Sequence, residues 1–256
     1  MFWKEFQKKK EKGANRLLMN KKYTHIFFDL DNTLWDFEIN SRNAMFATFH
    51  YFKPDSSSEF ELFFSTYTKN NHILWESYRK NEVAKKDLTR LRFQNTFTEL
   101  GITGVDADEM NEHYLNEMPK QKKLNDGVID ILNYLKTKRY HLNIITNGFE
   151  EVQHNKIESS GLKSFFDKIF ISEVIKSPKP ANAIFEYAIK SSNARKNKSI
   201  MIGDDWDVDV IGAVNFGIDA IYFNKTFQNP VKFNLNLKKT CEIYSVQHIC
   251  QLSDYL

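Results

Sequence analysis

Short apolar runs rich in isoleucine, phenylalanine and valine recur along the chain, and each is followed by a polar residue or a glycine. They occupy positions 24–28, 142–145, 168–171 and 199–202, with a fifth at 220–223. Runs that stay apolar are typical of strands buried on both faces of a parallel sheet. Between them, apolar residues repeat at helical spacing over 128–135 and 184–189. This alternation predicts an α/β fold with a doubly wound parallel sheet and right-handed crossovers.

The interval 37–122 breaks this rhythm, because it holds helical stripes and no run of the strand type. Phe60, Phe63, Phe64 and Tyr67 recur at helical spacing, and Asp87 is placed to cap a helix that ends before a glycine at position 101. We therefore predict an all-helical cap domain over 37–122, inserted into a core domain made of 21–36 and 123–256. Residues 1–20 are predicted to be a basic N-terminal extension.

Composition places the chain among ordinary soluble globular proteins. It has 256 residues, of which 41% are hydrophobic and 27% charged. Such values exclude a disordered, collagen-like or disulfide-scaffold protein, and no apolar stretch approaches the roughly 18 residues of a membrane span. The two cysteines, Cys241 and Cys250, lack metal-type spacing. A reduced, cytoplasmic location is therefore expected.

The net charge of +3 comes from the start of the chain, since residues 1–22 carry +6 and the remainder −3. Two interpretations of this segment stay open: a tail that adds little to the core, or a short basic amphipathic helix at a membrane surface. The body of the chain shows no basic stripe with interleaved aromatic residues. We accordingly expect a small-molecule partner, with no nucleic acid polymer and no membrane, in a monomer or a dimer.

Polar residues with chemical potential follow four of the predicted strands. Asp29 and Asp31 follow the first, Thr146 and Asn147 the second, Lys179 the third, and an acidic group of Asp204, Asp205 and Asp209 the fourth. Ligands of open α/β sheets bind beyond the carboxyl ends of the strands, so these side chains are expected to meet at one edge.

This set of side chains suits phosphoryl transfer. A carboxylate can act as the nucleophile and form an aspartyl-phosphate. Its charge repels a phosphate, so a divalent cation that prefers oxygen ligands, such as Mg²⁺, is required beside it. A lysine and a hydroxyl stabilise the remaining phosphate oxygens, and a second carboxyl protonates the leaving oxygen.

The same motifs resemble those of the haloacid dehalogenase-like hydrolase superfamily. The resemblance rests on FFDLDNTLWD at 27–36, ITNGF at 145–149, KP at 179–180 and GDDWDVD at 203–209. The longer stretches around the first two motifs look like the pyrimidine 5'-nucleotidase branch, in which a helical cap follows the first motif.

The resemblance implies a role for each motif residue. Asp29 corresponds to the nucleophile, and Asp31 to the general acid/base whose backbone carbonyl also faces the metal. Thr146 and the backbone N–H of Asn147 would hold the phosphoryl group, and Lys179 would bridge phosphate and nucleophile.

The metal Mg²⁺ would be held by Asp29, Asp31 and Asp204. Asp209 would support a metal-bound water or orient the lysine, and Thr33 is a further supporting residue. Asp205 departs from the small hydroxyl residue common in relatives and is a candidate to share the metal. Lys176, three residues before Lys179, is a rival lysine outside the Lys-Pro context.

Several functions share this motif set. A dehalogenase needs the carboxylate nucleophile but has no use for a leaving-group acid or Mg²⁺, so Asp31 and Asp204 argue against it. A phosphosugar mutase is not excluded by the motifs, whereas an inactive module would be expected to lack one of them. A phosphatase acting on pyrimidine nucleoside monophosphates is the preferred hypothesis. Small sugar phosphates, phosphoglycolate and flavin mononucleotide are the alternative substrates.

Substrate choice is expected to depend on the helical interval. Trp35 directly follows the catalytic loop and is the preferred candidate for a ligand wall. Further candidates for base stacking and anion contacts are Arg42, Tyr67, Trp75, Tyr78, Arg92 and Phe93. The competing interpretation is that aromatic residues at helical spacing simply form the core of the cap.

Overall fold

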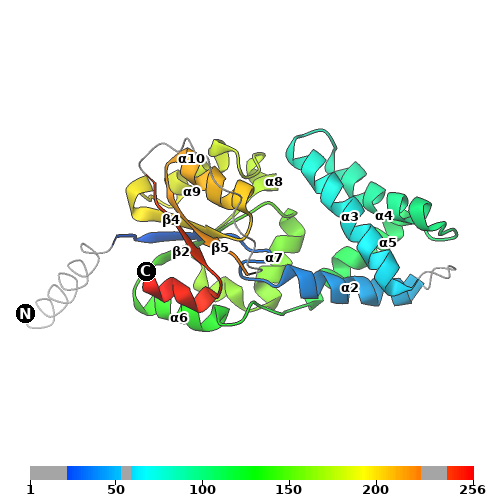
Figure 1. The fold of residues 1–256 in the computed structure, drawn as a ribbon, viewed down its shortest axis with the longest axis horizontal. Helices are drawn as coiled ribbons and strands as arrows, with labels where there is room; N and C mark the ends of the chain where they lie inside the picture. Colours follow the sequence, from blue (N-terminus) through cyan, green and yellow to red (C-terminus); the bar gives the residue numbers. More distant parts are fainter. Residues whose placement is uncertain (1–21, 53–58, 226–240) are drawn as a thin grey trace, which may run out of the picture. The chain divides into compact units, whose positions relative to one another are not determined.

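A parallel sheet organises the part of the chain that contains the predicted motifs. The computed structural model describes residues 22–52, 59–225 and 241–256 (Figure 1). Within these residues, six strands form one sheet in the order β3-β2-β1-β4-β5-β6, and every neighbouring pair is parallel. The strands are β1 (His25–Phe28), β2 (His141–Thr146), β3 (Lys168–Ile171), β4 (Ser199–Gly203), β5 (Asp219–Phe223) and β6 (Ile243–Val246). The predicted doubly wound α/β fold is confirmed.

All five predicted strands are present, and their ends agree with the prediction to within one residue. The sixth strand, β6, was not predicted. Its side chains are half-buried or exposed except for Val246. An edge strand of this kind lacks the continuous apolar run that identifies a strand buried on both faces.

Helices cover both faces of the sheet. In Figure 1, α9 (Asn182–Ser191) and α10 (Gly212–Phe216) lie on one face and α6 (Val128–Thr137) on the other. The remaining elements of this unit are α8 (Ser172–Ile175), η2 (Leu162–Phe165), η3 (Lys196–Lys198), the π-helix η4 (Trp206–Ile211) and η5 (Ile249–Asp254). The apolar stripes predicted over 128–135 and 184–189 are the buried faces of α6 and α9.

The second compact unit is helical. It comprises the described residues of Trp35–Leu124 together with Gly148–Leu162. Its elements are α2 (Phe37–Phe52), α3 (Phe60–Arg79), α4 (Lys85–Leu100), α5 (Ala107–Glu117), η1 (Met118–Lys120) and α7 (Glu150–Ser159). The described residues of 37–122 contain no strand. The unit also includes α7, which lies outside the predicted interval, so the domain boundaries stay a prediction.

One predicted helix start is wrong. Helix α4 begins at Lys85 after Ala84, so Asp87 lies in its first turn and does not cap it. An acidic residue there still interacts favourably with the positive end of the helix dipole. The predicted end is right, because Gly101 adopts the left-handed conformation, φ 65°, that ends many helices.

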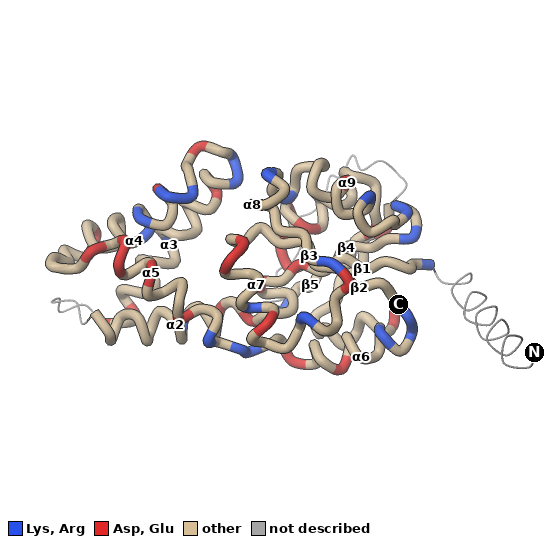
Figure 2. Tube along the Cα trace, turned by 180° about the vertical axis from the view of Figure 1, so that it is seen from behind, with Lys and Arg blue, Asp and Glu red and all other residues tan. Residues whose placement is uncertain are grey.

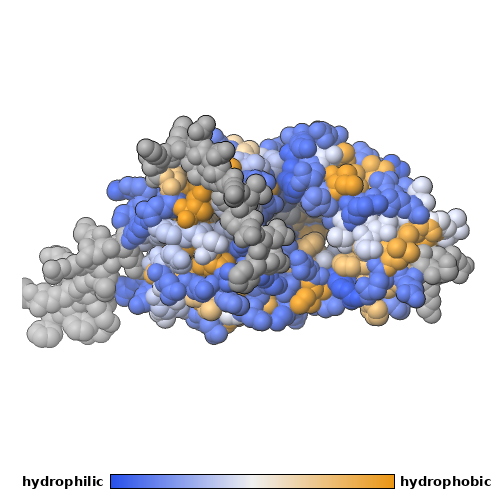
Figure 3. All heavy atoms as spheres, in the orientation of Figure 1, coloured by the Kyte–Doolittle hydropathy of each residue, from blue (hydrophilic) through white to orange (hydrophobic). Residues whose placement is uncertain are grey.

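The surface mixes charges of both signs. Figure 2 shows Lys and Arg interspersed with Asp and Glu along the described chain, and the face in Figure 3 is mostly hydrophilic with small separate apolar groups. No helix among the described residues is both long and apolar enough to span a bilayer. The two interpretations of the basic N-terminal segment fall on residues outside the described ranges.

Candidate active site

The three central strands bring the predicted site residues together. Strand β1 lies between β2 and β4, so the residues after these strands share one edge of the sheet. Asp29 follows β1 directly, Thr146 is the last residue of β2, and Asp204 follows β4. The backbone N–H of Asp29 donates to the carbonyl of Ile202 at 2.8 Å, which continues the parallel pairing past the strand end.

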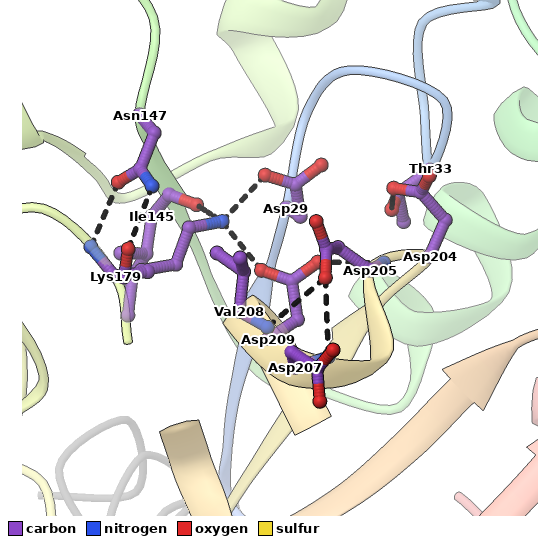
Figure 4. A network of polar contacts seen from close by, with 10 residues as sticks. All are labelled: Asp29, Thr33, Ile145, Asn147, Lys179, Asp204, Asp205, Asp207, Val208 and Asp209. Carbon is purple, nitrogen blue, oxygen red and sulfur yellow. Dashed lines mark hydrogen bonds and ion pairs between the residues drawn. The ribbon is translucent and has the colours of Figure 1, made fainter. Parts of the chain in front are cut away.

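A buried lysine is the centre of the polar network in Figure 4. The ammonium of Lys179, whose residue is 1% exposed, donates to Asp29 Oδ1 at 2.5 Å and to Asp209 Oδ1 at 2.6 Å. Its third hydrogen bond, at 2.8 Å, goes to the carbonyl of Ile145. All three N–H groups of the ammonium are therefore used. A contact from Lys179 to a phosphate would require it to share one of them.

Burial and mutual charge control the protonation of this cluster. Burial raises the pKa of Asp29; the charge of Lys179 opposes the rise and that of Asp209 adds to it. Burial also raises the pKa of Asp204, and the charges of Asp29 and Asp209 reinforce it. Burial alone would lower the pKa of Lys179, but the two carboxylates raise it above its usual value. The lysine is thus held as a cation, while the excess negative charge favours a further positive partner.

Asp29 and Asp204 provide oxygen ligands for such a partner. One carboxylate oxygen from each of Asp29, Asp204 and Asp209 lies within 4.8 Å of the others. The Thr33 hydroxyl donates to Asp204 Oδ1 at 3.1 Å. Among the described residues, no group donates a hydrogen bond to the second carboxylate oxygen of Asp29 or of Asp204. Hard divalent cations prefer free carboxylate oxygens of this kind, so the donor set fits Mg²⁺.

The other two aspartates of the group are already engaged. Asp205 caps the π-helix η4, since its Oδ1 accepts from the backbone N–H groups of Asp207 and Val208 at 3.1 and 3.0 Å. Asp209 pairs with Lys179 through one oxygen and accepts from the Asp205 N–H through the other, at 3.2 Å. The Asp209 contact is the one that an orienting role requires, whereas a metal-sharing Asp205 would have to combine that role with capping.

A glycine makes room for Asp209. A Cβ on Gly203, the last residue of β4, would overlap the Asp209 carboxylate. The glycine of the fourth motif is therefore a steric requirement of the ion pair.

Only one of the two candidate lysines joins the cluster. Lys176 is exposed, whereas Lys179 is buried. The side chain of Asn147 braces the loop that carries Lys179: its Oδ1 accepts from the backbone N–H of Lys179 at 2.8 Å, and its Nδ2 donates to the carbonyl of the same residue at 2.9 Å. The predicted phosphoryl contact of Asn147 concerned its backbone, so this side-chain role was missed.

Asn125 is a second residue that sequence reasoning missed. Its side-chain amide donates to the carbonyls of Asn32 and Thr33 at 2.7 and 3.0 Å, and its backbone N–H donates to the carbonyl of Leu34 at 3.0 Å. These bonds hold the turn that contains Asp31 and places Asn32 in the left-handed region, φ 63°. Asn125 stands far from the motifs in sequence, and only its place at the end of the helical interval offered a signal.

The structure argues against Trp35 as a ligand wall. Trp35 is fully buried, and its indole N–H donates to the carbonyl of Gln121 at 3.3 Å. The ammonium of Lys156 lies 4.4 Å from the centre of its ring system. A ring enclosed in this way belongs to the core of the helical unit, as the competing interpretation of the aromatic residues proposed.

The other candidates of the helical unit divide by exposure. Tyr67, Arg92 and Phe93 are buried, Trp75 and Tyr78 are half-buried around Phe149, and Arg42 is exposed. Arg42 forms an ion pair with Glu61. Only the half-buried and exposed members of this set present surface to a ligand directly.

Comparison with known proteins gives the family. A family model described as haloacid dehalogenase-like hydrolase matches residues 26–223. The chain belongs to this family. The haloacid dehalogenase-like architecture also accounts for the structural similarity to the HAD-hydrolase YfnB of Bacillus subtilis, solved bound to magnesium, with a TM-score of 0.78 and 24% identity over 91% of this chain and 98% of that one. At that identity the likeness shows the fold alone.

Two curated haloacid dehalogenase-like relatives are named as pyrimidine 5'-nucleotidases. PynA of Streptococcus pneumoniae is 29% identical over 234 residues, which cover 91% of this chain and 95% of the relative. YjjG of Escherichia coli is 29% identical over 205 residues, or 79% of this chain and 87% of the relative. The resemblance predicted from the four motifs is therefore confirmed at the level of the family.

The first prediction concerns Asn125. Asn125→Asp removes the amide donor and places a carboxylate beside two carbonyl oxygens, so the turn that carries Asp31 should loosen. Loss of a residue that supports a catalytic site typically costs about 10–100-fold in activity. We expect kcat to fall by that factor in steady-state assays, with a cooperative unfolding transition retained. Asn133→Asp, at an exposed position of α6, is the matched control. Equal kcat in both variants would contradict the role.

Proposed function

We propose that the protein is a magnesium-dependent phosphatase that hydrolyses pyrimidine nucleoside 5'-monophosphates through an aspartyl-phosphate. Membership of the hydrolase family supports the reaction class. The observation that carries the proposal is the Asp29 carboxylate, paired through one oxygen with the buried Lys179 and with no donor among the described residues on the other. A carboxylate held in this way is charged and has an oxygen available for attack on phosphorus.

In the first step, an oxygen of Asp29 forms a bond to phosphorus, and the bond between phosphorus and the ribose 5'-oxygen breaks. The leaving oxygen takes a proton from the Asp31 carboxyl, which is the general acid. In the second step Asp31 removes a proton from water, whose oxygen attacks the phosphorus and displaces the Asp29 carboxylate. Lys179, through its ion pair, keeps Asp29 in position in both steps. Thr146 and the backbone N–H of Asn147 would orient the phosphoryl oxygens.

Asp29, Asp204 and the backbone carbonyl of Asp31 would hold the magnesium ion. When bound, Mg²⁺ would supply the positive charge that offsets the repulsion between the nucleophile and the phosphate. Thr33 positions Asp204 by its hydrogen bond, and Asp209 positions Lys179. These contacts come from the protein alone and place the two carboxylates before any ligand binds.

The two pyrimidine 5'-nucleotidase relatives support the substrate class, since each aligns with most of this chain. Both described cysteines are free, which is compatible with the cytoplasm as the place of action. Small sugar phosphates, phosphoglycolate and flavin mononucleotide are the competing substrates.

A substrate panel tests this assignment. With Mg²⁺ present, we expect kcat/KM for uridine and thymidine 5'-monophosphates to exceed that for ribose 5-phosphate by about 10–100-fold, because base contacts contribute roughly 1–3 kcal/mol. The panel includes phosphoglycolate, flavin mononucleotide and adenosine 5'-monophosphate, with phosphate release as the measurement. Faster turnover of a sugar phosphate than of every nucleotide would contradict the nucleotidase assignment and leave a general phosphatase.

The two catalytic aspartates should separate in rapid-quench labelling with a phosphate-labelled substrate. Asp29→Asn removes the nucleophile, so no label should remain on the protein. Asp31→Asn keeps the nucleophile but lacks the acid/base, so nucleotide turnover should fall by about 10²–10⁴-fold. p-Nitrophenyl phosphate, whose leaving group needs no proton, should still label this variant slowly. Asp130→Asn, at an exposed position of α6, is the control. Label retained by Asp29→Asn would overturn the role assignment.

Magnesium binding has a readout that does not depend on turnover. A ligand that binds only the folded state stabilises it by about 2.7 kcal/mol at a concentration of 100 Kd. We expect Mg²⁺ to raise the Tm of the wild type and to have little effect on Asp204→Asn, which loses a charged ligand oxygen. Asp207→Asn, exposed in the same segment, should respond like the wild type. Undiminished turnover after exhaustive chelation would show that no metal is needed.

A further inference from the structure

The helical unit buries an arginine among neutral partners. Arg92 of α4 is 3% exposed. Its Nε and Nη2 both donate to Asn111 Oδ1 of α5, at 3.2 and 2.5 Å, and its Nη1 donates to Asn71 Oδ1 of α3 at 3.2 Å. A guanidinium has five N–H groups, so two are left over after these three bonds.

Aromatic rings occupy much of the remaining surroundings. The guanidinium carbon of Arg92 lies 5.4–5.8 Å from the ring centres of Tyr67, Phe93 and Tyr114. None of the described carboxylates forms an ion pair with Arg92. Ring faces attract a cation but provide no oxygen acceptor. A buried charge without an anionic partner is costly, and natural proteins usually pair it.

A neighbouring polar atom is unpaired as well. The hydroxyl of Tyr67 is buried and has no hydrogen-bond partner. Burial raises the pKa of Tyr67, while the charge of Arg92 and the nearby Tyr114 hydroxyl oppose that rise. Most buried hydroxyls are paired, so an orphaned one beside a guanidinium with unused donors is a recurrent sign of a binding site.

We propose that Arg92 and the Tyr67 hydroxyl recognise a carbonyl oxygen of the substrate's base, within the helical unit. The pyrimidine ring supplies this group, because uracil, thymine and cytosine all carry a carbonyl at C2. Adenine has no carbonyl, so the same donors would discriminate against it. This assignment rests on the proposed nucleotidase function and names the residues that select the pyrimidine.

The competing explanation is that Arg92 only ties α3, α4 and α5 together. The two explanations differ for a variant that completes the pairing internally. Asn111→Asp would give the guanidinium a carboxylate, which should satisfy the fold and occupy the donors. Tyr67→Phe removes a hydroxyl that bonds nothing in the protein, so the fold loses no hydrogen bond.

The experiment measures Tm, steady-state kinetics and uridine binding by calorimetry for the full chain. Tyr67→Phe and Asn111→Asp should keep or raise Tm and leave p-nitrophenyl phosphate turnover unchanged. For each, the ratio of kcat/KM for uridine to adenosine 5'-monophosphate should fall about tenfold, the equivalent of ~1.4 kcal/mol. Tyr187→Phe, on exposed α9 surface, is the control. Uridine affinity should fall in parallel with this ratio.

Three results would overturn the proposal. One is an unchanged uridine affinity and nucleotide ratio in both variants, which would make the cluster structural. A second is weaker binding of inorganic phosphate with uridine binding intact, which would make it an anion site. The third is a parallel loss for adenosine 5'-monophosphate. Failure of the nucleotidase assignment itself would appear separately, as wild-type turnover of p-nitrophenyl phosphate but of no nucleotide.

Discussion

The burial of Lys179 between two carboxylates is the interaction on which the site at the sheet edge depends. A buried ammonium without partners costs several kcal/mol, as does a buried carboxylate, so removing any member exposes the others to that cost. The pairing fixes Asp29, which follows β1, against Asp209, which lies in η4. The nucleophile is therefore positioned by electrostatics within the protein and does not rely on a ligand to order it.

This constraint explains residues that otherwise look incidental. Gly203 has no side chain because the Asp209 carboxylate occupies the space where a Cβ would lie. Asn147 braces both backbone polar groups of Lys179, which sets the point from which the long side chain enters the cluster. Asp205 holds the first turn of η4 and so the placement of Asp209. Each residue acts on the ion pair through the backbone.

Sequence reasoning succeeded where one local rule decides the outcome. Continuous apolar runs identified β1 to β5, and the strand-end rule grouped Asp29, Thr146 and Asp204. It failed where loop conformation decides: nothing local indicates that Asn125 reaches the turn after Asp31, or that Asp205 caps a π-helix. Trp35 was misjudged because position after a catalytic loop says little about burial. An edge strand such as β6 carries too little apolar signal to be recognised.

The two buried cations of the protein show how a site can be distinguished from a structural contact. Lys179 has three N–H groups and three acceptors, two of them charged, so its bonding is complete within the chain. Arg92 is as deeply buried but has neutral amide acceptors for only three of five N–H groups, beside a hydroxyl with none. Complete pairing explains a residue that positions a nucleophile. Incomplete pairing at the same depth requires another source of acceptors, and a carbonyl-bearing base is the group that the proposed substrates would provide.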